Sequence, residues 1–311
     1  MMSVLLIQEI GKKSDGNNMI QSVPIFLNEA PFFIAEVSSN HGKDLKRCLD
    51  FIDCAAAIGC NAVKFQLFKI DQLFSFEALN KHSYLRDRKE WELPVDFLPY
   101  LKERCLQKGI KFGCTPFYLE GVNELYQYVD FYKISSYELL WHDLIVKCAE
   151  TLKPIIISTG MSEINEIQSA CEKVMSVSNL KPYLLHCTSS YPTPINEANL
   201  SAIETIRNFS FCEVGWSDHT VSDAVIYRAV HKWSAKIIEF HLDLDGAGDE
   251  YKTGHCWLPN QIKNVILNIR QSLDSDGLGI KEPVNSELLD RGWRADPIDG
   301  LRPLISTRSK L

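Results

Sequence analysis

Short apolar runs alternate along most of the chain with longer segments in which apolar residues recur at helical spacing. The short runs are typical of strands buried on both faces, and the longer segments of helices with one buried face. From Pro31 onward the pattern holds eight strands separated by helices. Strands separated by helices pair in parallel and eight such units favour closure, so the sequence predicts an α/β protein with a (β/α)₈ TIM barrel. The expected strands are 32–37, 62–67, 110–115, 132–136, 154–158, 182–187, one ending in Trp-Ser-Asp-His-Thr, and 235–241.

Three parts are expected along the chain. Residues 1–30 hold two short apolar runs joined by a polar turn, which predicts an N-terminal β-hairpin that caps the barrel. Residues 31–275 form the barrel, and residues 276–311, where Gly and Pro recur without sustained periodicity, form an irregular C-terminal extension. Within the barrel, segment 68–93 is long and rich in charge, so we expect either a lid over a site or a solvated surface loop.

The composition indicates a globular protein, since 45% of the residues are hydrophobic and 23% are charged. The formal charge of −7 gives no reason to expect a nucleic-acid partner, so an anionic substrate requires a local basic pocket. The ten cysteines include no CxxC pair and lie mostly in apolar stretches, as expected of buried thiols in a reducing compartment. No stretch approaches a membrane span and the N-terminus lacks the features of a signal peptide, so we expect a cytoplasmic protein with no membrane partner.

Reactive polar residues gather where the predicted strands end. Barrel enzymes build their sites from these ends, so the residues there are candidate site residues. Any single serine among them is more often a turn or helix-capping residue, and the clustering therefore carries the argument. The candidates are Glu36, Lys64, Gln66, Thr115, Lys133, Ser136, Glu138, Ser158, Ser189, Tyr191, Ser217 and Glu239.

Two of these candidates, Lys64 and Lys133, lie within or at the end of apolar strands. A lysine is rarely buried without a partner, and its simplest use here is to hold an anion. Ser136, Ser158 and Ser189 lie on nearby strand ends and supply hydroxyl donors for a phosphate. The sequence thus predicts an anion pocket.

Histidines close the last two predicted strands, at His219 and His241. These strands are neighbours in a closed barrel, so both imidazoles can reach one metal ion at the mouth. The alternative is a pair of ordinary hydrogen-bonded histidines. A metal with two protein ligands keeps open positions, which suits a Lewis acid that polarises a carbonyl. Together with the anion pocket and Glu36, this indicates chemistry between a phosphorylated anion and a carbonyl compound.

At these residues the chain resembles the sialic acid synthase family, which condenses phosphoenolpyruvate with an N-acylated hexosamine to give a nine-carbon nonulosonic acid. The resemblance runs from Ile34 to about Leu258 and implies a (β/α)₈ barrel, in agreement with the strand pattern. Several segments match in the right order, which is far more specific than a single match. They are IAEVSSNHG, NAVKFQLFK, FGCTPF, YKISSYEL, KPIIISTGMSEINEI, LLHCTSSYPTP, VGWSDHT and IIEFHLDLD.

The resemblance implies a role for most candidates. His219 and His241 match the ligands of a divalent metal, Mn²⁺ or Mg²⁺. Five residues match the binding positions for phosphoenolpyruvate, with Lys64 close by: Lys133, Ser136, Ser158, Ser189 and Ser217. Four match positions that face the sugar or the reacting carbons: Glu36, Gln66, Tyr191 and Glu138. We expect the catalytic residues to be Glu36, Lys64, Lys133, Glu138 and Glu239, and Thr115 to contact substrate.

The chain departs from the family in three places. Only residues 276–311 follow the barrel, where the family usually carries an antifreeze-like domain that supplies an arginine to the partner's sugar site in a homodimer. The loop LDLDGAGDEYK is shorter than the corresponding segment of the family, which usually contains Gly-Pro-Asp-His. The acidic sugar contact is therefore Asp249, Glu250 or neither. Ser189 stands where the family often has asparagine. The arginines of the tail either replace the missing arginine or pair with surface carboxylates; they are Arg291, Arg294 and Arg302.

The leading prediction is a metal-dependent homodimeric synthase that condenses phosphoenolpyruvate with an amino-sugar aldose. One alternative is a related barrel that condenses or cleaves another carbonyl substrate. Another is a non-catalytic partner subunit, against which the presence of all the central candidates argues: Glu36, Lys64, Lys133, His219 and His241.

Overall fold

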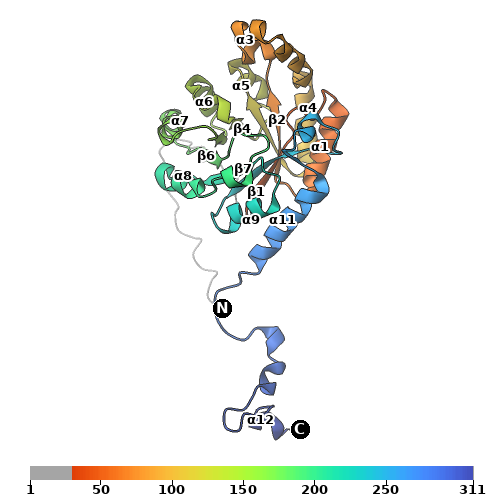
Figure 1. Ribbon diagram of the computed structural model, residues 1–311, viewed down its shortest axis with the longest axis vertical. Helices are drawn as coiled ribbons and strands as arrows, with labels where there is room; N and C mark the ends of the chain where they lie inside the picture. The colour runs from red at the N-terminus through yellow and green to blue at the C-terminus, as the bar shows by residue number, and fades with distance from the viewer. Residues whose placement is uncertain (1–29, 311) are drawn as a thin grey trace, which may run out of the picture. The chain divides into compact units, whose positions relative to one another are not determined.

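A closed barrel of parallel strands surrounded by helices dominates the computed structural model, which describes residues 30–310 (Figure 1). Strands β1 to β8 follow one another around the ring in chain order, and β8 pairs with β1 to close it. The predicted (β/α)₈ barrel is confirmed, whereas the predicted N-terminal hairpin lies outside the described residues. The strands are β1 (Phe32–Glu36), β2 (Ala62–Leu67), β3 (Lys111–Pro116), β4 (Phe131–Ile134), β5 (Ile155–Ser158), β6 (Tyr183–His186), β7 (Val214–Asp218), β8 (Ile237–Leu242) and a short β9 (Cys256–Trp257) beside β8.

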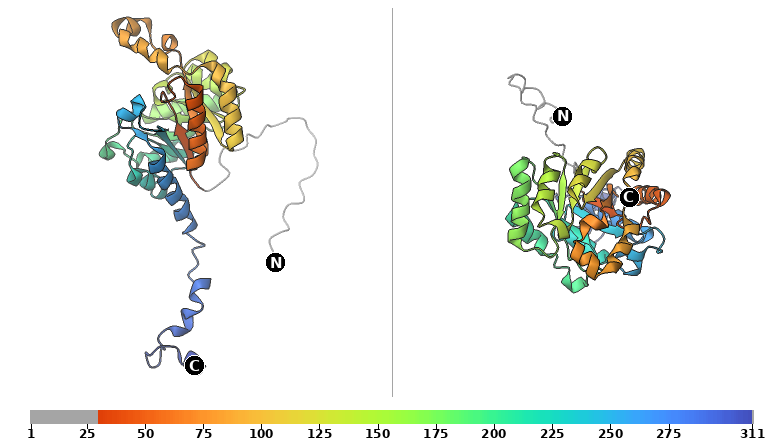
Figure 2. Two further views of the ribbon diagram at one scale, coloured as in Figure 1. Left: turned by 90° about the vertical axis from the view of Figure 1, so that its right-hand side faces the viewer. Right: turned by 90° about the horizontal axis from the view of Figure 1, so that it is seen from above.

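Helices cover the outside of the strands, and Figure 2 shows α1 and α4 side by side there. The signals that bound α1 are local: the Asp44 side chain accepts from the backbone N–H groups of Lys46 and Arg47, and Gly59 ends the helix at a left-handed φ of 95°. The helices are α1 (Leu45–Ile58), α2 (Ile70–Leu73), α3 (Phe76–Lys81), α4 (Leu98–Lys108), α5 (Leu119–Leu125), α6 (His142–Ala149), α7 (Ile164–Val177), α8 (Ala202–Ser210), α9 (Asp223–His231), α10 (Asp249–Lys252), α11 (Pro259–Asp274) and α12 (Ile305–Arg308).

Two apolar layers hold the barrel together. The outer layer lies between strands and helices and includes nearly all the buried helix residues. The inner layer fills the floor of the barrel with side chains from six strands: Phe32, Ile34, Ala62, Phe131, Ile156, Leu185 and Ile237. At Gly113 of β3 an added Cβ would lie 2.1 Å from the Phe131 ring, so the glycine makes room for that ring. The floor is therefore a packed core and leaves the opposite end of the barrel for polar groups.

The structure corrects three details of the predicted pattern. Segment 68–93 is not a loop, because it forms α2, α3 and the 3₁₀ helix η1 (Ser83–Trp91) around a small apolar cluster of Phe68, Ile70, Leu79 and Leu85. β4 ends at Ile134 because the Ser135 side chain accepts from the Tyr137 backbone and starts the 3₁₀ helix η3 (Ser136–Glu138). The short elements β9 and α10 were not predicted, since neither is long enough to show a period.

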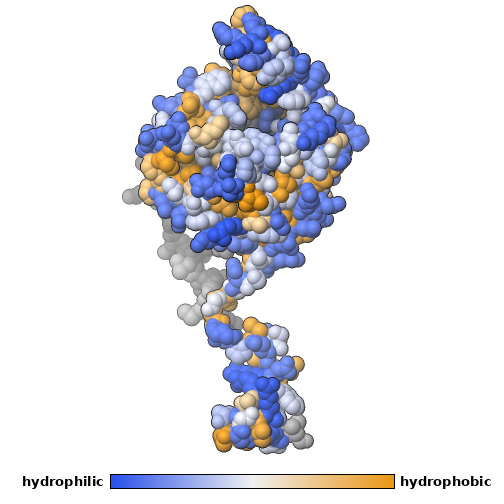
Figure 3. Space-filling view, viewed as in Figure 1, coloured by the Kyte–Doolittle hydropathy of each residue, from blue (hydrophilic) through white to orange (hydrophobic). Residues whose placement is uncertain are grey.

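Contacts divide the chain into two units, one ending at Ile269 and one from Arg270 to Leu311. The second unit holds the 3₁₀ helices η5 (Asn285–Glu287) and η6 (Asp290–Trp293) as well as α12, and the predicted domain boundaries stay predictions. Two further short 3₁₀ helices, η2 (Val95–Phe97) and η4 (Ile195–Glu197), belong to the first unit. The face in Figure 3 is largely hydrophilic with scattered hydrophobic patches. None of the helices in residues 30–310 is long and apolar enough to cross a membrane.

Asp218 connects the end of β7 to neighbouring residues through hydrogen bonds. Its substitution tests how much these bonds stabilise the C-terminal end of the barrel. The buried carboxylate accepts from Trp216 Nε1 at 3.0 Å, Trp257 Nε1 at 2.9 Å and Thr220 Oγ1 at 2.7 Å. We predict that Asp218→Ala lowers the free energy of unfolding by about 3 kcal/mol, because these donors lose a charged acceptor. Urea denaturation checks this, with Asp50→Ala, an exposed ion-pair partner on α1, as the control. Equal changes in both variants would contradict the role given to Asp218.

Candidate active site

The inward-facing side chains change from apolar to polar along each strand, and this change builds the site. In β8, Ile237 belongs to the apolar floor, whereas Glu239 and His241 follow at alternate positions. The strand register places His241 beside Glu36, and Glu36 beside Lys64. Polar candidates from distant parts of the sequence thus meet at the C-terminal end of the barrel, as predicted.

Glu36 and Lys64 form a buried ion pair with Oε2 and Nζ 2.5 Å apart. Gln66 donates from Nε2 to the other carboxylate oxygen at 2.7 Å, and Lys64 donates to Thr115 Oγ1 at 3.1 Å. Burial, the largest effect on Lys64, lowers its pKa, but Glu36 and Glu239 outweigh burial and raise the pKa above its ordinary value. Lys64 is therefore held as a cation.

Lys133 and Glu239 form a second buried pair, with Nζ 3.2 Å from Oε1. Ser217 donates to the same oxygen at 3.2 Å, while Oε2 has no hydrogen-bond partner within residues 30–310. Burial raises the pKa of Glu239, but Lys133 and Lys64 outweigh it and bring the pKa below its ordinary value. For Lys133 burial prevails over Glu239, so its pKa is lowered. One carboxylate oxygen beside this lysine therefore stays available for a ligand.

Hydroxyl groups that follow two strands, β4 and β6, meet around Gly160, which follows β5. The Gly160 backbone N–H donates to Ser136 Oγ at 3.0 Å, and an added Cβ would lie 2.3 Å from Ser189 Oγ. Ser189 Oγ is buried without a hydrogen-bond partner in the described part of the chain. Burial raises the pKa of the neighbouring Cys187 thiol, although Ser136 and Lys133 oppose the effect. Small donors beside a lysine fit an anion such as phosphate.

His219 and His241 lie next to each other, with ring centroids 5.4 Å apart. His219 Nδ1 is 2.8 Å from the Thr188 carbonyl, which only accepts, so Nδ1 carries the proton and Nε2 is left without one. Burial, followed by the charge of His241, lowers the pKa of His219 to about 3. Tyr191 packs against His219 at 4.3 Å between centroids. A neutral imidazole with a fixed tautomer fits a metal ligand.

A second set of metal-ligating groups surrounds His241, and sequence reasoning missed two of its members, His255 and Cys256. Ligand atoms of His241, Glu250, His255 and Cys256 lie within 4.8 Å of one another. Three of these groups already contact each other, since Glu250 Oε2 is 3.0 Å from His241 Nδ1 and 3.6 Å from His255 Nε2. Burial raises the pKa of the Cys256 thiol and keeps it protonated. The Nε2 atoms of His219 and His241 are therefore the better metal donors, and they fit a divalent ion with open positions.

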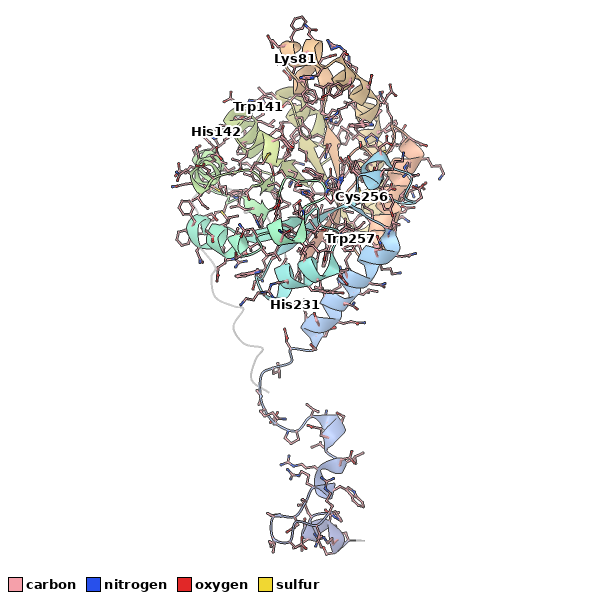
Figure 4. The ribbon with its side chains drawn as sticks, in the orientation of Figure 1. Lys81, Trp141, His142, His231, Cys256 and Trp257 are labelled. Carbon is pink, nitrogen blue, oxygen red and sulfur yellow. The ribbon has the colours of Figure 1, made fainter. Side chains whose placement is uncertain are left out.

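Figure 4 separates the central groups from peripheral ones. Cys256 lies near the middle of the barrel, whereas His142 and His231 lie on the outer helices α6 and α9. His255 could not be singled out from the sequence, because it precedes a strand of only two residues.

The remaining candidates are placed differently. Ser158 is buried at the end of β5. Burial raises the pKa of Glu138 to about 7, and its carboxylate contacts Ser135 Oγ. Asp249 is exposed and pairs with Lys252 at 2.8 Å, so it contacts none of the other candidates in residues 30–310. The tail arginines belong to the second unit, where Arg294 binds the Arg291 carbonyl.

A separate hollow lies at the opposite, N-terminal ends of β6 and β7, lined among others by Lys181, Arg207 and Phe211. Both cations there already donate to backbone carbonyls, Lys181 to Phe211 and Arg207 to Trp233. Among the described residues that line this hollow there is no histidine, whereas carboxylates and histidines meet at the other end of the barrel.

Comparisons with known proteins agree with this geometry. The NeuB family model matches residues 51–281. The N,N'-diacetyllegionaminic acid synthase of Campylobacter jejuni is 34% identical over 271 residues, covering 82% of this chain and 80% of the relative. A pseudaminic acid synthase of the same species is 30% identical over 259 residues, covering 80% and 75%. The crystal structure of an N-acetylneuraminic acid synthetase from Leptospira borgpetersenii has a TM-score of 0.74 and 31% identity, covering 84% of this chain and 90% of that one.

The substitution Gly160→Ala tests the anion cradle, the name we give to Lys133 together with Gly160 and the hydroxyl groups of Ser136 and Ser189. The added methyl group would occupy the space beside Ser189 Oγ and Ser136 Oγ, so we predict that affinity for phosphoenolpyruvate falls about 10-fold or more, as expected when one charge-assisted hydrogen bond is lost. Isothermal titration calorimetry measures the affinity, and Gly121→Ala in α5 is a matched control. Unchanged anion affinity in a folded Gly160→Ala protein would place the anion elsewhere.

Proposed function

The chain belongs to the NeuB family, and on this premise we propose that it condenses phosphoenolpyruvate with an N-acylhexosamine-type aldose to form a nonulosonic acid, with release of phosphate. One observation carries the proposal. The groups around Lys133 that could hold an anion lie at the same end of the barrel as His219 and His241. The Nδ1 atoms of both histidines face hydrogen-bond acceptors, which leaves the Nε2 atoms for a metal. The first suits the phosphorylated substrate and the second suits a metal that acts on a carbonyl.

Phosphoenolpyruvate would bind through the cradle. Lys133 supplies positive charge, and hydroxyl donors come from Ser136, Ser189 and Ser217. Lys133 and Ser217 lie on strands of a packed barrel, and Ser136 and Ser189 lie in the connections just after β4 and β6. We therefore expect these groups to be held in place before the substrate arrives. The buried charges of Lys64 and Lys133 are balanced by Glu36 and Glu239, which keeps both lysines in place without substrate.

The sugar would bind on the other side of the cradle, near Glu36, Gln66 and Tyr191. His219 and His241 would hold Mn²⁺ or Mg²⁺, which when bound supplies a Lewis acid for the aldehyde oxygen of the open-chain sugar. In the reaction C3 of phosphoenolpyruvate forms a bond to the aldehyde carbon, water adds at C2, and phosphate leaves by C–O cleavage. We propose that Glu138, whose pKa burial raises to about 7, exchanges a proton with the reacting groups.

The identity of the sugar is a separate question. The relatives above carry the names of different nonulosonic acid synthases, so family membership fixes the type of condensation more closely than the sugar. We further propose that the protein acts in the cytoplasm as a homodimer.

Phosphate release from phosphoenolpyruvate with a panel of hexosamines and shorter aldoses, with and without Mn²⁺, tests the function. We expect release that depends on both an N-acylhexosamine and the metal, and a nine-carbon acid by mass spectrometry. Release with a shorter aldose alone would favour a related condensing barrel. No release with any sugar, from a folded protein that binds metal, would favour a non-catalytic subunit.

His219→Ala removes one of the two proposed metal ligands. We predict that metal-dependent turnover falls at least 100-fold and Mn²⁺ affinity at least 10-fold, while the circular dichroism spectrum is unchanged. His231→Ala, at the outer end of α9, is the control. Wild-type Mn²⁺ affinity in His219→Ala, measured by calorimetry, would rule out this ligand.

Lys133→Ala tests the phosphoenolpyruvate site. We predict that the Michaelis constant for phosphoenolpyruvate rises by about 30- to 150-fold, because a charge-assisted contact is worth about 2–3 kcal/mol. The Michaelis constant for the sugar should change little, and Lys46→Ala, at an exposed position on α1, should alter neither. A change confined to the sugar constant would show that Lys133 contacts the other substrate.

A further inference from the structure

Both carboxylate oxygens of Glu250 are already engaged by groups of the protein. Oε1 accepts from Ser38 Oγ at 2.5 Å, from Ser39 Oγ at 2.8 Å and from the Ser39 backbone N–H at 3.2 Å. Oε2 is bound by His241 Nδ1 at 3.0 Å and is approached by His255. A carboxylate with this many donors is held in one orientation, and a sugar hydroxyl would have to displace one of them.

The loop after β8 is built to bring Glu250 to this place. At Gly248 an added Cβ would lie 2.4 Å from Asn40 Oδ1, so glycine lets the loop approach the segment after β1 this closely. Arg47 of α1 anchors the start of the loop by binding Asp243 and Asp245, each at 2.9 Å. The position of Glu250 is therefore fixed from both sides of the loop.

The segment after β1 is shaped to meet the same carboxylate. Ser38 adopts a left-handed φ of 49°, a conformation that costs a non-glycine residue about 1–2 kcal/mol. This turn directs the Ser38 hydroxyl and the next backbone N–H to one oxygen of Glu250. Gln66 Nε2 donates to Ser38 Oγ at 3.1 Å and to Glu36, which links the carboxylate to the proposed sugar side of the site.

The contact determines which nitrogen of His241 is free. A carboxylate only accepts, so His241 Nδ1 carries a proton and donates it to Glu250. When the ring is neutral, this leaves Nε2 as the metal-binding atom. His219 is arranged in the same way, except that its Nδ1 donates to the Thr188 carbonyl. The pair thus has one backbone acceptor and one side-chain acceptor, and only the second can be removed by mutation.

We propose that Glu250 is a positioning residue that fixes the tautomer and orientation of His241 as a metal ligand, and that it is neither the acidic sugar contact nor a ligand itself. This inference rests on the proposed function only in taking His241 as a metal ligand.

The test uses the metal-free protein labelled with ¹⁵N-histidine, at a pH where the rings are neutral. Long-range ¹H–¹⁵N spectra report which ring nitrogen carries the proton. In the wild type we expect an Nδ1–H tautomer at both His219 and His241. Glu250→Ala should shift His241 away from this tautomer and leave His219 unchanged as an internal control, while Mn²⁺ affinity by calorimetry falls about 10- to 100-fold.

Glu250→Gln separates positioning from ligation and guards against a folding defect. The amide oxygen still accepts from Nδ1–H, so we expect the tautomer to be retained and the Mn²⁺ affinity to fall less than in Glu250→Ala. Asp249→Asn removes the adjacent exposed carboxylate and should leave the spectra and the affinity unchanged. Thermal unfolding verifies that each variant is folded.

Two results would overturn the proposal. An unchanged His241 tautomer and unchanged Mn²⁺ affinity in Glu250→Ala would show that the carboxylate does not position the ring. Equal and complete loss of Mn²⁺ binding in both Glu250 variants, with the tautomer retained in Glu250→Gln, would show that the carboxylate is itself a ligand. Neither measurement uses phosphoenolpyruvate or sugar, so a protein that passes both and yet makes no product would refute the proposed function alone.

Discussion

Along β8, Ile237, Glu239 and His241 face the inside of the barrel because alternate side chains of a strand point to the same face. Closure of the ring by the β1–β8 pair then sets the height of every inward-facing residue relative to its neighbours. The lowest inward positions form the apolar floor, and the next ones carry lysine and carboxylate. A slip of one residue in any strand would turn its charged group toward the outer apolar layer, so this register fixes both the core and the site.

The charges inside the barrel are tolerated because they are paired. Lys64 lies against Glu36 and Lys133 against Glu239, and removing one member of such a pair leaves a buried charge without compensation. Pairing is nevertheless incomplete, since Glu239 Oε2 and Ser189 Oγ have no hydrogen-bond partner among the described residues. Buried polar atoms left in this state are costly in a purely structural core, and their position beside Lys133 suits a ligand that would supply the missing contacts.

The sequence predicted the parts of the site that lie on strands and missed those that depend on loops. Strand periodicity is local, so the eight strands and the polar residues at their ends could be found without a structure, and the proximity of His219 and His241 followed from closure alone. The contact between Ser38 and Glu250 joins residues 212 positions apart through a short loop, and no local pattern marks it. The sequence predicts a loop for segment 68–93 because its many charged residues outnumber the few apolar residues that form a small separate cluster.

The division between strands and loops also bears on substrate choice. Lys133, Ser217 and His241 lie on strands, whose positions are fixed by the barrel, while Tyr191 and Glu250 lie in the connections after β6 and β8. Loops change in sequence with little effect on the core, so relatives can keep one condensation reaction and differ in the sugar. If Glu250 is used to hold His241, it cannot also bind the sugar without weakening that hold. Under this proposal the acidic sugar contact comes from another carboxylate of the site.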